Sequence, residues 1–306
     1  MSREDNIKEV NSLTKNKPFW NGLFHILFIL YSAACIIPLI LVLSISFTEE
    51  MTITTEGYNF IPKVFSVEAY KWVVKSGDAI FRAYGISIFV TVVGTICSVA
   101  IIAMFAYVIS RKDFKYRNIF SFIVFFTMIF NGGLVPWYMV YTNLLGINNS
   151  ILALIVPSLA NAWYVMIMRT FYQTNVPESL IESAKIDGAG ELRTFIQIVL
   201  PLAKAGLATI GLFQTLVFWN DWYLPLMLID DAKWFNLQYL LYKTLAAIQY
   251  LSQASQMTMS ADALAKMPQE GARMAMCILA IGPIVIAYPF FQKYFVKGLT
   301  VGAVKG

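Results

Sequence analysis

Long apolar runs separated by shorter polar segments fill most of this 306-residue chain. Six such runs can be drawn, at 20–47, 85–110, 118–142, 151–170, 202–229 and 272–292. Each is long enough to cross the hydrocarbon core of a bilayer, which takes about 20 apolar residues in a helix. The first run would extend about 42 Å as a helix, so we expect it to tilt or to protrude. The pattern predicts an all-α polytopic membrane protein with six transmembrane helices.

Prolines lie within or at the edges of most of these runs. In a helical bundle, neighbouring helices can satisfy the backbone groups that a proline leaves unbonded. We therefore expect kinks near these prolines, with broken helices as the alternative. The residues are Pro38, Pro136, Pro157, Pro225, Pro283 and Pro289.

The positions of lysine and arginine indicate the orientation, because cytoplasmic segments of membrane proteins are enriched in both. Residues 1–18 carry four basic residues, and the short connection 111–117 carries four more. Others lie in the polar stretch between the fourth and fifth runs and at the end of the chain, whereas 143–150 has none. Both termini are therefore expected in the cytoplasm.

The composition agrees with a membrane protein and excludes several other classes. Hydrophobic residues make up 58% and charged residues only 13% of the chain, whereas soluble domains have about 25% charged residues. The net charge of +5 is modest and gives no reason to expect a nucleic-acid partner. Cys35, Cys97 and Cys277 lie in apolar runs without metal-type spacing, and His25 is the single histidine. We expect these four residues to pack, and we expect no metal site.

Two further patterns limit the function. The first apolar run is too long for the core of a signal peptide and lacks a small-residue cleavage site, so it reads as a retained anchor. The chain has no G-x-x-x-x-G-K-[ST] sequence, the loop that cradles nucleotide phosphates. A nucleotide-driven activity would therefore need another subunit.

The polar stretch between the fourth and fifth runs carries the most specific motif. It reads Glu182-Ser183-Ala184, three residues, Gly188, nine residues, then Ile198-Val199-Leu200-Pro201. This spacing resembles the EAA loop of bacterial ABC importers, E-A-A, x3, G, x9, I-x-L-P, with a serine in place of the second alanine. In that family the loop docks the permease onto its ATPase. The resemblance implies ATPase-coupling roles for Glu182, Ser183, Ala184, Gly188, Ile198, Leu200 and Pro201.

The same stretch predicts a short amphipathic helix over 177–187. Pro177 suits the first turn of a helix, since its missing N–H would be unbonded there anyway. Leu180, Ile181 and Ala184 fall on one face of this helix. Gly188 would end it, because glycine accepts the positive φ that closes a helix.

A second helix is expected from about Glu191 into the fifth run. Phe195, Ile198 and Leu202 recur along it at helical spacing. The expected result is an amphipathic helix that projects from the membrane and is braced by a rigid arm. The alternative is an ordinary amphipathic loop that lies on the lipid headgroups.

The end of the chain carries a second specific pattern. From Gly298-Leu299-Thr300 to Gly306 it resembles the tail of carbohydrate ABC importer permeases of the maltose-transporter type, commonly F-x-x-F-x-x-G-L-T-x-G-x-V-K-G. In that family the tail reaches between the two ATPase subunits. We expect the glycines to make it flexible rather than helical; the alternative is a disordered basic terminus. The tail residues expected to contact the ATPases are Gly298, Leu299, Thr300, Gly302 and Lys305.

The resemblance covers essentially the whole chain and implies the ABC importer type I permease fold in the bacterial cell membrane. It implies a heterodimer with a second homologous permease, two ATPase subunits and an extracytoplasmic solute-binding protein. ATP and Mg would be used by the ATPase partners, with no cofactor bound by this chain and no enzymatic activity of its own. The expected substrate is a sugar or oligosaccharide, and the chain looks most similar to the permeases of complex-oligosaccharide importers.

This reading divides the chain into three regions. Residues 1–18 form a cytoplasmic segment, 19–292 the transmembrane permease domain and 293–306 a cytoplasmic tail. Within the permease domain, 174–201 is the cytoplasmic coupling segment and 230–271 an outer loop. In the maltose-type family the corresponding loop can enter the sugar cleft of the binding protein.

Polar and aromatic residues inside the runs are candidates for the substrate path. Asp221 is an acid within the fifth run, and such residues usually face a bundle interior or a water-filled cavity. Aromatic faces beside amides and carboxylates suit sugars, whose C–H faces stack on rings while their hydroxyls form hydrogen bonds. The alternatives are an interfacial aromatic belt and a structural hydrogen-bond role. The candidates are Asn131, Tyr138, Asn161, Trp219, Asn220, Asp221 and Trp222, with Asn220 and Asp221 foremost.

Other functions remain open from the sequence. A passive channel or a proton-coupled carrier would also be a six-span bundle with an intramembrane acid, but neither needs the EAA spacing. An ABC importer for amino acids, metals or phosphonates would keep the loop but not this tail. An exporter is disfavoured, because exporters usually dock through different loops.

Overall fold

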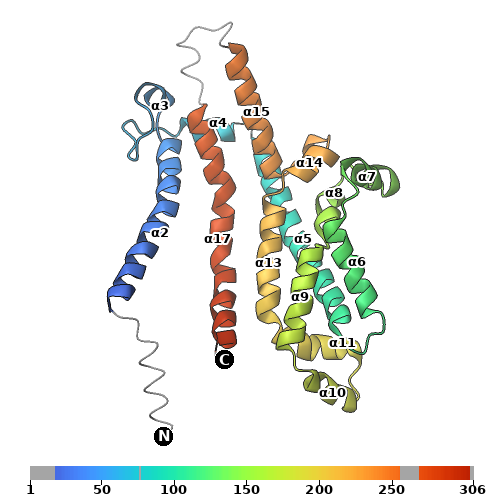
Figure 1. The fold of residues 1–306 in the computed structure, drawn as a ribbon. Coiled ribbons are helices and arrows are strands. Elements are labelled where there is room, and N and C mark those ends of the chain that lie inside the picture. Colours follow the sequence, from blue (N-terminus) through green and yellow to red (C-terminus); the bar gives the residue numbers. More distant parts are fainter. Residues whose placement is uncertain (1–17, 76, 256–268, 304–306) are drawn as a thin grey trace. The chain divides into compact units, whose positions relative to one another are not determined.

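The computed structural model describes residues 18–75, 77–255 and 269–303, and its helices are shown in Figure 1. Within these ranges the regular structure is helical, and extended chain pairs only at an isolated bridge between Thr48 and Phe65. The chain divides into two compact units, Met1–Val73 with Gln256–Ile278 and Val74–Ser255 with Leu279–Gly306. The all-helical architecture predicted from the hydrophobic pattern is confirmed.

The first unit contains α2 (Pro18–Ser46), α3 (Glu50–Glu56), most of α4 (Glu68–Val74) and the start of α17 (Glu270–Ala303). The side chain of Glu50 accepts hydrogen bonds from the backbone N–H groups of Glu270 and Gly271, at 2.8 and 2.9 Å. A carboxylate is favoured there, because the first N–H groups of a helix are unbonded and its N-terminus is partly positive. Glu50 thereby fixes the start of α17 to α3.

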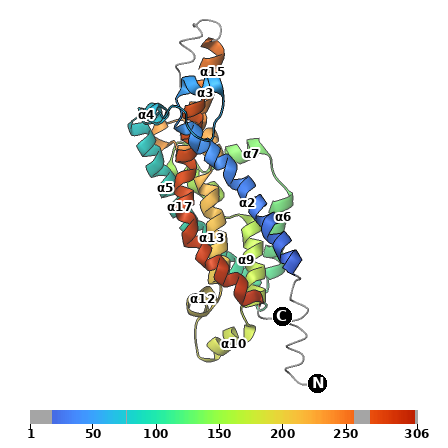
Figure 2. The same ribbon diagram turned by 90° about the vertical axis from the view of Figure 1, so that its left-hand side faces the viewer.

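The second unit is built around α5 (Asp78–Ser110), a 33-residue helix against which most of the others pack. Figures 1 and 2 show α13 and α9 running alongside it, and the contacts between these helices agree. The remaining elements of this unit follow in chain order. They are α6 (Arg117–Ile129), α7 (Leu134–Met139), η1 (Val140–Leu144), α8 (Ile151–Ile155), η2 (Val156–Ser158), α9 (Ala162–Asn175), α10 (Glu178–Ile186), α11 (Glu191–Thr194), η3 (Phe195–Val199), α12 (Leu200–Leu202), α13 (Lys204–Trp219), α14 (Tyr223–Leu228), η4 (Ala232–Trp234) and α15 (Leu237–Ser255).

Glycines let aromatic rings enter the helix contacts of the second unit. A Cβ atom on Gly94 of α5 would lie 2.7 Å from the ring of Phe218 in α13. A Cβ atom on Gly206 of α13 would lie 2.9 Å from the ring of Phe171 in α9. Close packing of this kind matters in a bilayer, where lipid tails are as apolar as the side chains and burial alone does not drive helix association.

Of the six predicted spans, those in the second unit are less regular than the sequence suggests. Within the described residues, α2 and α5 are long and apolar enough to cross a membrane. Three further candidates are bent pairs of helices, by 117° between α6 and α7–η1, by 48° between α8–η2 and α9, and by 81° between α11–α12 and α13. Over 118–142, 151–170 and 202–229 the structure therefore has broken helices, which the sequence left open as the alternative to kinks.

Two of the three breaks have a clear local cause. Gly133 has φ of +86°, and its N–H donates to the side chain of Asn131 at 2.8 Å, which ends α6. Pro157 lies in the 3-10 turn η2, and Asn161 then accepts from the N–H groups at the start of α9. These asparagines favour turns and helix starts because their side chains bond nearby backbone groups.

The tail also differs from the sequence expectation. The backbone of α17 remains helical through Gly298 and Gly302 to Ala303, so the prediction of a non-helical tail is wrong over these residues. A single glycine lowers helix stability by only about 1 kcal/mol relative to alanine, and the preceding turns of the helix supply the nucleus. Gly306 and Lys305 lie outside the described residues.

Candidate functional site

The predicted amphipathic helix corresponds to α10, and its boundaries follow the sequence signals. It begins directly after Pro177, and Gly188 lies just beyond its end with φ of +77°. The N–H of Ala189 returns to the carbonyl of Ala184 at 2.9 Å, which satisfies one of the last carbonyl groups of the helix. Glycine is needed at position 188 because other residues rarely adopt this conformation.

Two faces of α10 differ in their contacts. Ile181 and Ala184 are buried, whereas Leu180 and Ile186 are exposed, at 43% and 86%. The prediction that Leu180 shares the packed face of Ile181 and Ala184 is therefore wrong. Neighbouring residues on a helix point about 100° apart, and only positions 181 and 184 face the rest of the bundle.

A network of ion pairs holds α10 against the loop after α5. Lys112 pairs with Glu178 at 2.5 Å, and Asp113 pairs with Lys185 at 2.5 Å. Arg111 binds the carboxylate of Asp113 through two nitrogens, at 2.9 and 3.2 Å. The basic loop 111–117 therefore braces α10 in addition to indicating the orientation of the chain, and this second role was not predicted from the sequence. The adjacent Arg111, Lys112 and Asp113 were the available signal, since charges of both signs in one short loop can form several ion pairs. A network of ion pairs contributes more to stability than an isolated surface pair.

The second arm of the segment is tied into the same network. Glu191, the first residue of α11, accepts a hydrogen bond from the hydroxyl of Tyr107 at 3.0 Å and pairs with Lys185 at 3.2 Å. Lys185 therefore joins Asp113 in the loop after α5 to Glu191, which lies across the turn at Gly188 from Lys185. The hydrogen bonds that Arg111 and Lys185 donate to the Asp113 carboxylate lower its pKa to about 2.

The arm itself differs from the expected helix. Residues Phe195–Val199 form a π-helical turn, in which the N–H of Leu200 bonds to the carbonyl of Phe195. Phe195, Val199 and Ala203 are buried at a spacing of four, whereas Ile198 is half-buried and Leu202 is exposed. The predicted face of Phe195, Ile198 and Leu202 is therefore wrong, because the wider turn keeps every fourth residue in line. The 81° bend near Ala203 also separates this arm from α13.

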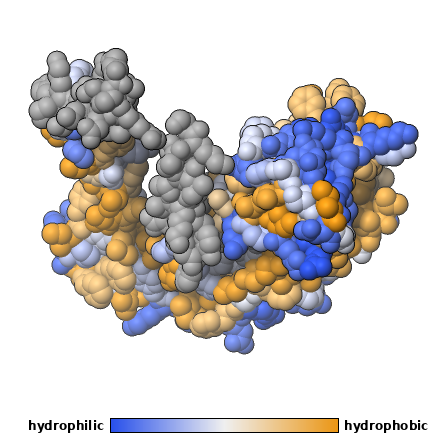
Figure 3. Space-filling view, turned by 90° about the horizontal axis from the view of Figure 1, so that it is seen from below, coloured by the Kyte–Doolittle hydropathy of each residue, from blue (hydrophilic) through white to orange (hydrophobic). Residues whose placement is uncertain are grey.

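The outward side of the segment is available to a partner. Glu182 and Ser183 are exposed, and Glu182 has no ion-pair partner in the described part of the chain. Ile186 and Leu192 are exposed at 86% and 69%. Seen from below, the end of the second unit that carries α10 and α11 is mainly hydrophilic with a small hydrophobic patch inside it (Figure 3). Such a surface can bind a protein through apolar contacts surrounded by charge.

Not every motif residue lies on that outward surface. Ala184 packs inward, and Leu200 is half-buried beside the exposed Pro201. These residues therefore shape the segment, whereas Glu182 and Ser183 face away from the bundle. In the tail, Gly298, Leu299, Thr300 and Gly302 belong to the backbone of α17, and Lys305 lies outside the described residues.

The candidate path residues around Asp221 lie at a break between helices. α13 ends at Trp219 and α14 begins at Tyr223. The carboxylate of Asp221 accepts from the N–H groups of Tyr223 and Leu224, at 3.0 and 3.1 Å, so it caps the start of α14. The prediction that residues 219–222 follow one another on a single helix is therefore wrong.

The two tryptophans beside this break have different surroundings. Trp219 is 4% exposed, and its indole N–H donates to the carbonyl of Ala280 at 2.9 Å. Its ring and its donor are both used within the chain, so we no longer expect it to touch substrate. Trp222 is 42% exposed and stacks on Tyr242 of α15, with ring centroids 4.9 Å apart. Asn220 is exposed in the break.

The remaining candidates lie at the other breaks. Asn131 and Asn161 each accept hydrogen bonds from backbone N–H groups of a following turn or helix. Both therefore have a structural role that their residue type already suggests, because asparagine side chains often bond the backbone of a turn or a helix start. Tyr138 is 41% exposed on α7. The structure thus groups Trp222 with Tyr242, leaves Asn220 exposed in the break before Trp222, and puts Asn131 and Asn161 at helix boundaries.

Known proteins resemble this chain over most of its length. The sequence profile of the family described as "Binding-protein-dependent transport system inner membrane component" matches residues 99–301. The polygalacturonan/rhamnogalacturonan transport system permease protein YtcP of Bacillus subtilis (strain 168) is 36% identical, covering 95% of this chain and 100% of the relative. Protein LplC of the same organism is also 36% identical, covering 90% of each.

A solved structure is similar as well. A chain from the crystal structure of a bacterial ABC transporter involved in the import of the acidic polysaccharide alginate superposes with a TM-score of 0.76. It is 27% identical and covers 96% of this chain and 99% of that chain.

Proposed function

This chain belongs to the family of binding-protein-dependent transport system inner membrane components, and on that premise we propose that it is the transmembrane permease subunit of an ATP-driven importer for sugars or oligosaccharides. The similarity along almost the full length to a polygalacturonan/rhamnogalacturonan permease carries the proposal. A structure from an alginate importer with the same fold supports the same substrate class. The chain acts as a conduit and a coupling element rather than as an enzyme.

The proposed topology has six membrane crossings with both termini in the cytoplasm. The proposed crossings are α2, α5, the bent pair of α6 and α7–η1, the bent pair of α8–η2 and α9, α13, and α17. The basic loop after α5 and the basic residues around α10 support a cytoplasmic position for that end of the second unit. In this arrangement α10 and α11 face the compartment in which ATP is present. A bacterial cell membrane is the proposed location, with 1–18 and 293–306 on its cytoplasmic side.

Docking of an ATPase on α10 is the proposed route of energy transfer. The exposed Glu182 offers a carboxylate to a basic residue, and the exposed Ile186 and Leu192 offer apolar contacts beside it. The ion pairs to Glu178 and Lys185 connect α10 to the ends of α5 and α11. A movement of α10 caused by the ATPase would therefore be transmitted to α5 and α11 through these ion pairs and through the packed side chains of Ile181 and Ala184.

The proposed partners follow from this division of labour. Two ATPase subunits bind and hydrolyse ATP with Mg, while a second permease completes the pathway as a heterodimer. An extracytoplasmic solute-binding protein delivers the sugar, and the segment 230–271, which includes α15, is proposed to face it. The tail of α17 is proposed to reach the ATPases through Gly298, Leu299, Thr300, Gly302 and Lys305.

For the substrate path we propose Asn220 and Trp222 as the leading residues, together with Tyr242. Trp222 and Tyr242 present stacked rings with about two-fifths of each side chain exposed, which suits the apolar face of a sugar ring. Asn220 lies in the helix break beside them and offers both a donor and an acceptor. The carboxylate of Asp221 is used in a helix cap, so its contact with substrate would go through its second oxygen.

The function can be tested by reconstituting the permease with its ATPase, second permease and binding protein in proteoliposomes. Uptake of labelled oligogalacturonides should require ATP inside the vesicles and the binding protein outside. Uptake that persists without ATPase subunits would contradict the importer assignment. Uptake of amino acids or phosphonates in place of oligosaccharides would keep the importer class and overturn the substrate class.

A further inference from the structure

A pocket of about 460 Å³ lies beside α10 of the coupling segment, among the ends of α5 and α9 and the start of α6. Its lining contains four cationic side chains but a single carboxylate, that of Glu178. The cations are Arg111, Lys112, Arg117 and Arg169. Neutral polar side chains such as Asn118 complete the wall. The pocket is therefore strongly biased towards a negatively charged occupant.

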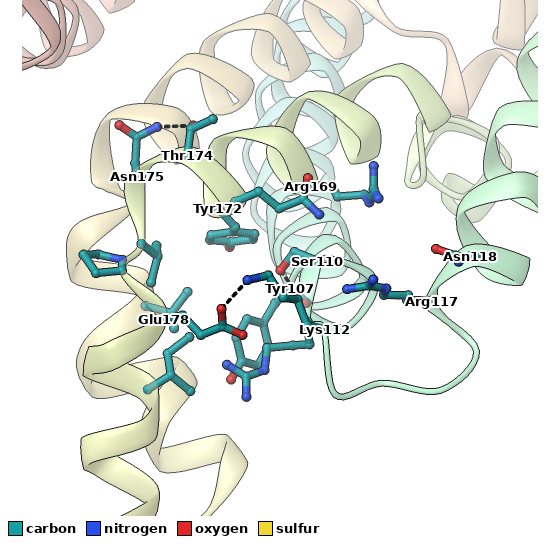
Figure 4. A pocket seen from close by; sticks show the side chains of 16 residues that line it. Tyr107, Ser110, Lys112, Arg117, Asn118, Arg169, Tyr172, Thr174, Asn175 and Glu178 are labelled. Atoms are coloured by element: carbon teal, nitrogen blue, oxygen red, sulfur yellow. Dashed lines mark hydrogen bonds and ion pairs between the residues drawn. The ribbon is translucent and has the colours of Figure 1, made fainter. Parts of the chain in front are cut away.

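Two of the four cations are already neutralised by carboxylates. Lys112 pairs with Glu178 in the pocket wall, and Arg111 pairs with Asp113 outside it. Arg117 and Arg169 have no carboxylate partner among the described residues. Arg169 donates through Nε to the carbonyl of Ile109 at 3.3 Å, which leaves its terminal nitrogens free of that bond. Both arginines are half-buried, and Figure 4 shows them on the same side of the pocket, away from the Lys112–Glu178 pair.

The start of α6 adds to this positive field. Arg117 is the first residue of this 13-residue helix, whose first turn has no acidic residue and whose N-cap, Tyr116, makes no side-chain cap. The N-terminus of a helix carries a partial positive charge, so an arginine there is the opposite of what the helix dipole favours. An anion at this point would be stabilised by both the helix and Arg117.

An apolar groove of about 540 Å³ lies next to the pocket, between α6 and α9. Thr174 lines both cavities, so the two adjoin. The other lining residues are Phe125, Met128, Trp163, Met166, Ile167, Thr170 and Phe171. From Thr174 to Trp163 along α9, and from Arg117 to Met128 along α6, the rise is about 16 Å. Half of a bilayer core is about 15 Å thick, so the groove spans the acyl chain region of one leaflet.

We propose that the pocket and the groove together bind one anionic phospholipid. Its phosphate lies between Arg117 and Arg169, and one acyl chain follows the groove towards Trp163. A soluble anion would use the arginines but not the groove, and an uncharged lipid would use the groove but not the arginines. Glu178 and Ile181 of α10 line the same pocket, so the lipid would lie beside the coupling helix.

The full-length permease in lipid nanodiscs tests this directly. Lipids with brominated acyl chains quench nearby tryptophans, and the difference between the wild type and Trp163→Phe isolates the signal of Trp163. Brominated phosphatidylglycerol should quench Trp163 at a mole fraction at least about fivefold lower than brominated phosphatidylcholine, given the contribution of each basic residue to anionic lipid binding. Arg117→Gln with Arg169→Gln should abolish the difference, and Lys115→Gln, in the same loop but outside the pocket, should retain it.

Three results would overturn the proposal. Equal quenching by the two lipids in the wild type would remove the headgroup preference, and a preference that survives in the double glutamine variant would place its origin elsewhere. Stabilisation of the detergent-solubilised protein by inorganic phosphate, dependent on Arg117 and Arg169 at matched ionic strength, would assign the pocket to a soluble anion.

The variant Arg117→Lys with Arg169→Lys is the control for folding. It keeps both positive charges and should keep the preference for phosphatidylglycerol, which separates loss of binding from loss of folding.

Discussion

Glu182 is the exposed carboxylate of α10 and has no ion-pair partner among the described residues, so its charge is available to another subunit. Glu182→Lys should lower uptake at least about tenfold, because like charges brought together across an interface cost several kcal/mol. Membrane insertion should be unchanged. Uptake by Glu182→Gln should lie between that of the wild type and that of Glu182→Lys, since glutamine keeps the size of the side chain and loses only the charge attraction. ATPase co-purification and uptake at wild-type levels in Glu182→Lys would contradict the docking role.

Asp113 acts differently, because its partners lie within the chain. Its pKa is lowered from 3.8 to about 2 by the hydrogen bonds from Arg111 and Lys185. A lowered pKa means that its stabilising effect is complete above pH 3.8 and is lost as the pH falls through 2. The Asp113 side chain is 50% exposed, so screening keeps the effect to about 1 kcal/mol or less.

This predicts a bracing network that does not change with pH in the physiological range. Asp113→Asn should speed hydrogen exchange of the α10 amides severalfold at every pH from about 5 to 9, as expected from a loss of up to about 1 kcal/mol. Lys115→Gln in the same loop should leave exchange unchanged. A strong pH dependence of the wild-type exchange free energy over this range would count against the assignment.

At the scale of single elements, the break between α13 and α14 poses a choice between two roles of Asp221. If its carboxylate serves mainly as a helix cap, Asp221→Asn should transport like the wild type, because asparagine caps equally well. Asp221→Ala should then lower stability by about 1 kcal/mol and reduce transport with it. If its charge belongs to the substrate path, both variants should lose transport at unchanged stability. Uptake and thermal unfolding measured on both variants distinguish the two roles.

The elements also show where sequence patterns were sufficient. The boundaries of α10 followed from Pro177 and Gly188, because both residues restrict the backbone itself. The packed faces of Leu180 and Leu202 were predicted wrongly, since periodicity alone does not reveal which side meets the bundle or where a π turn widens the helix. Asn131 and Asn161 are path candidates by their position in apolar runs, but asparagine also favours turns and helix starts, and both residues bond the backbone there.

At the scale of the whole molecule, hydropathy was enough to predict an all-helical membrane protein. It did not decide between kinks and breaks, because the bends after α6 and before α9 depend on a few turn residues inside otherwise continuous apolar runs, and the third bend lies at the edge of a run. The ion pairs between the basic loop and α10 were also out of reach, since they join residues about 70 positions apart in the sequence, a separation that local patterns do not record. The spacing of the motif residues predicted the protein family, which hydropathy and local patterns could not identify.

The tail gives a prediction that involves the whole assembly. Deletion of residues 297–306 should reduce substrate-stimulated ATP hydrolysis more than membrane insertion, because insertion depends on the apolar spans. Basal hydrolysis and the amount of assembled complex serve as controls. A stimulation ratio equal to that of the full chain would reduce the tail to an inert extension.

The bent spans have a consequence for how the chain is made. α6 and α9 are about 20 Å long by their 13 and 14 residues, shorter than the roughly 30 Å that a lone helix must cross. Their breaks leave backbone groups that lipid cannot satisfy, so these segments must enter the bilayer against α5. Nascent chains that end after Ser110 should already resist carbonate extraction, whereas α6–η1 fused alone behind a cleavable leader should be extracted. Synthesis from the N-terminus places the long straight helix in the membrane before the broken ones that depend on it.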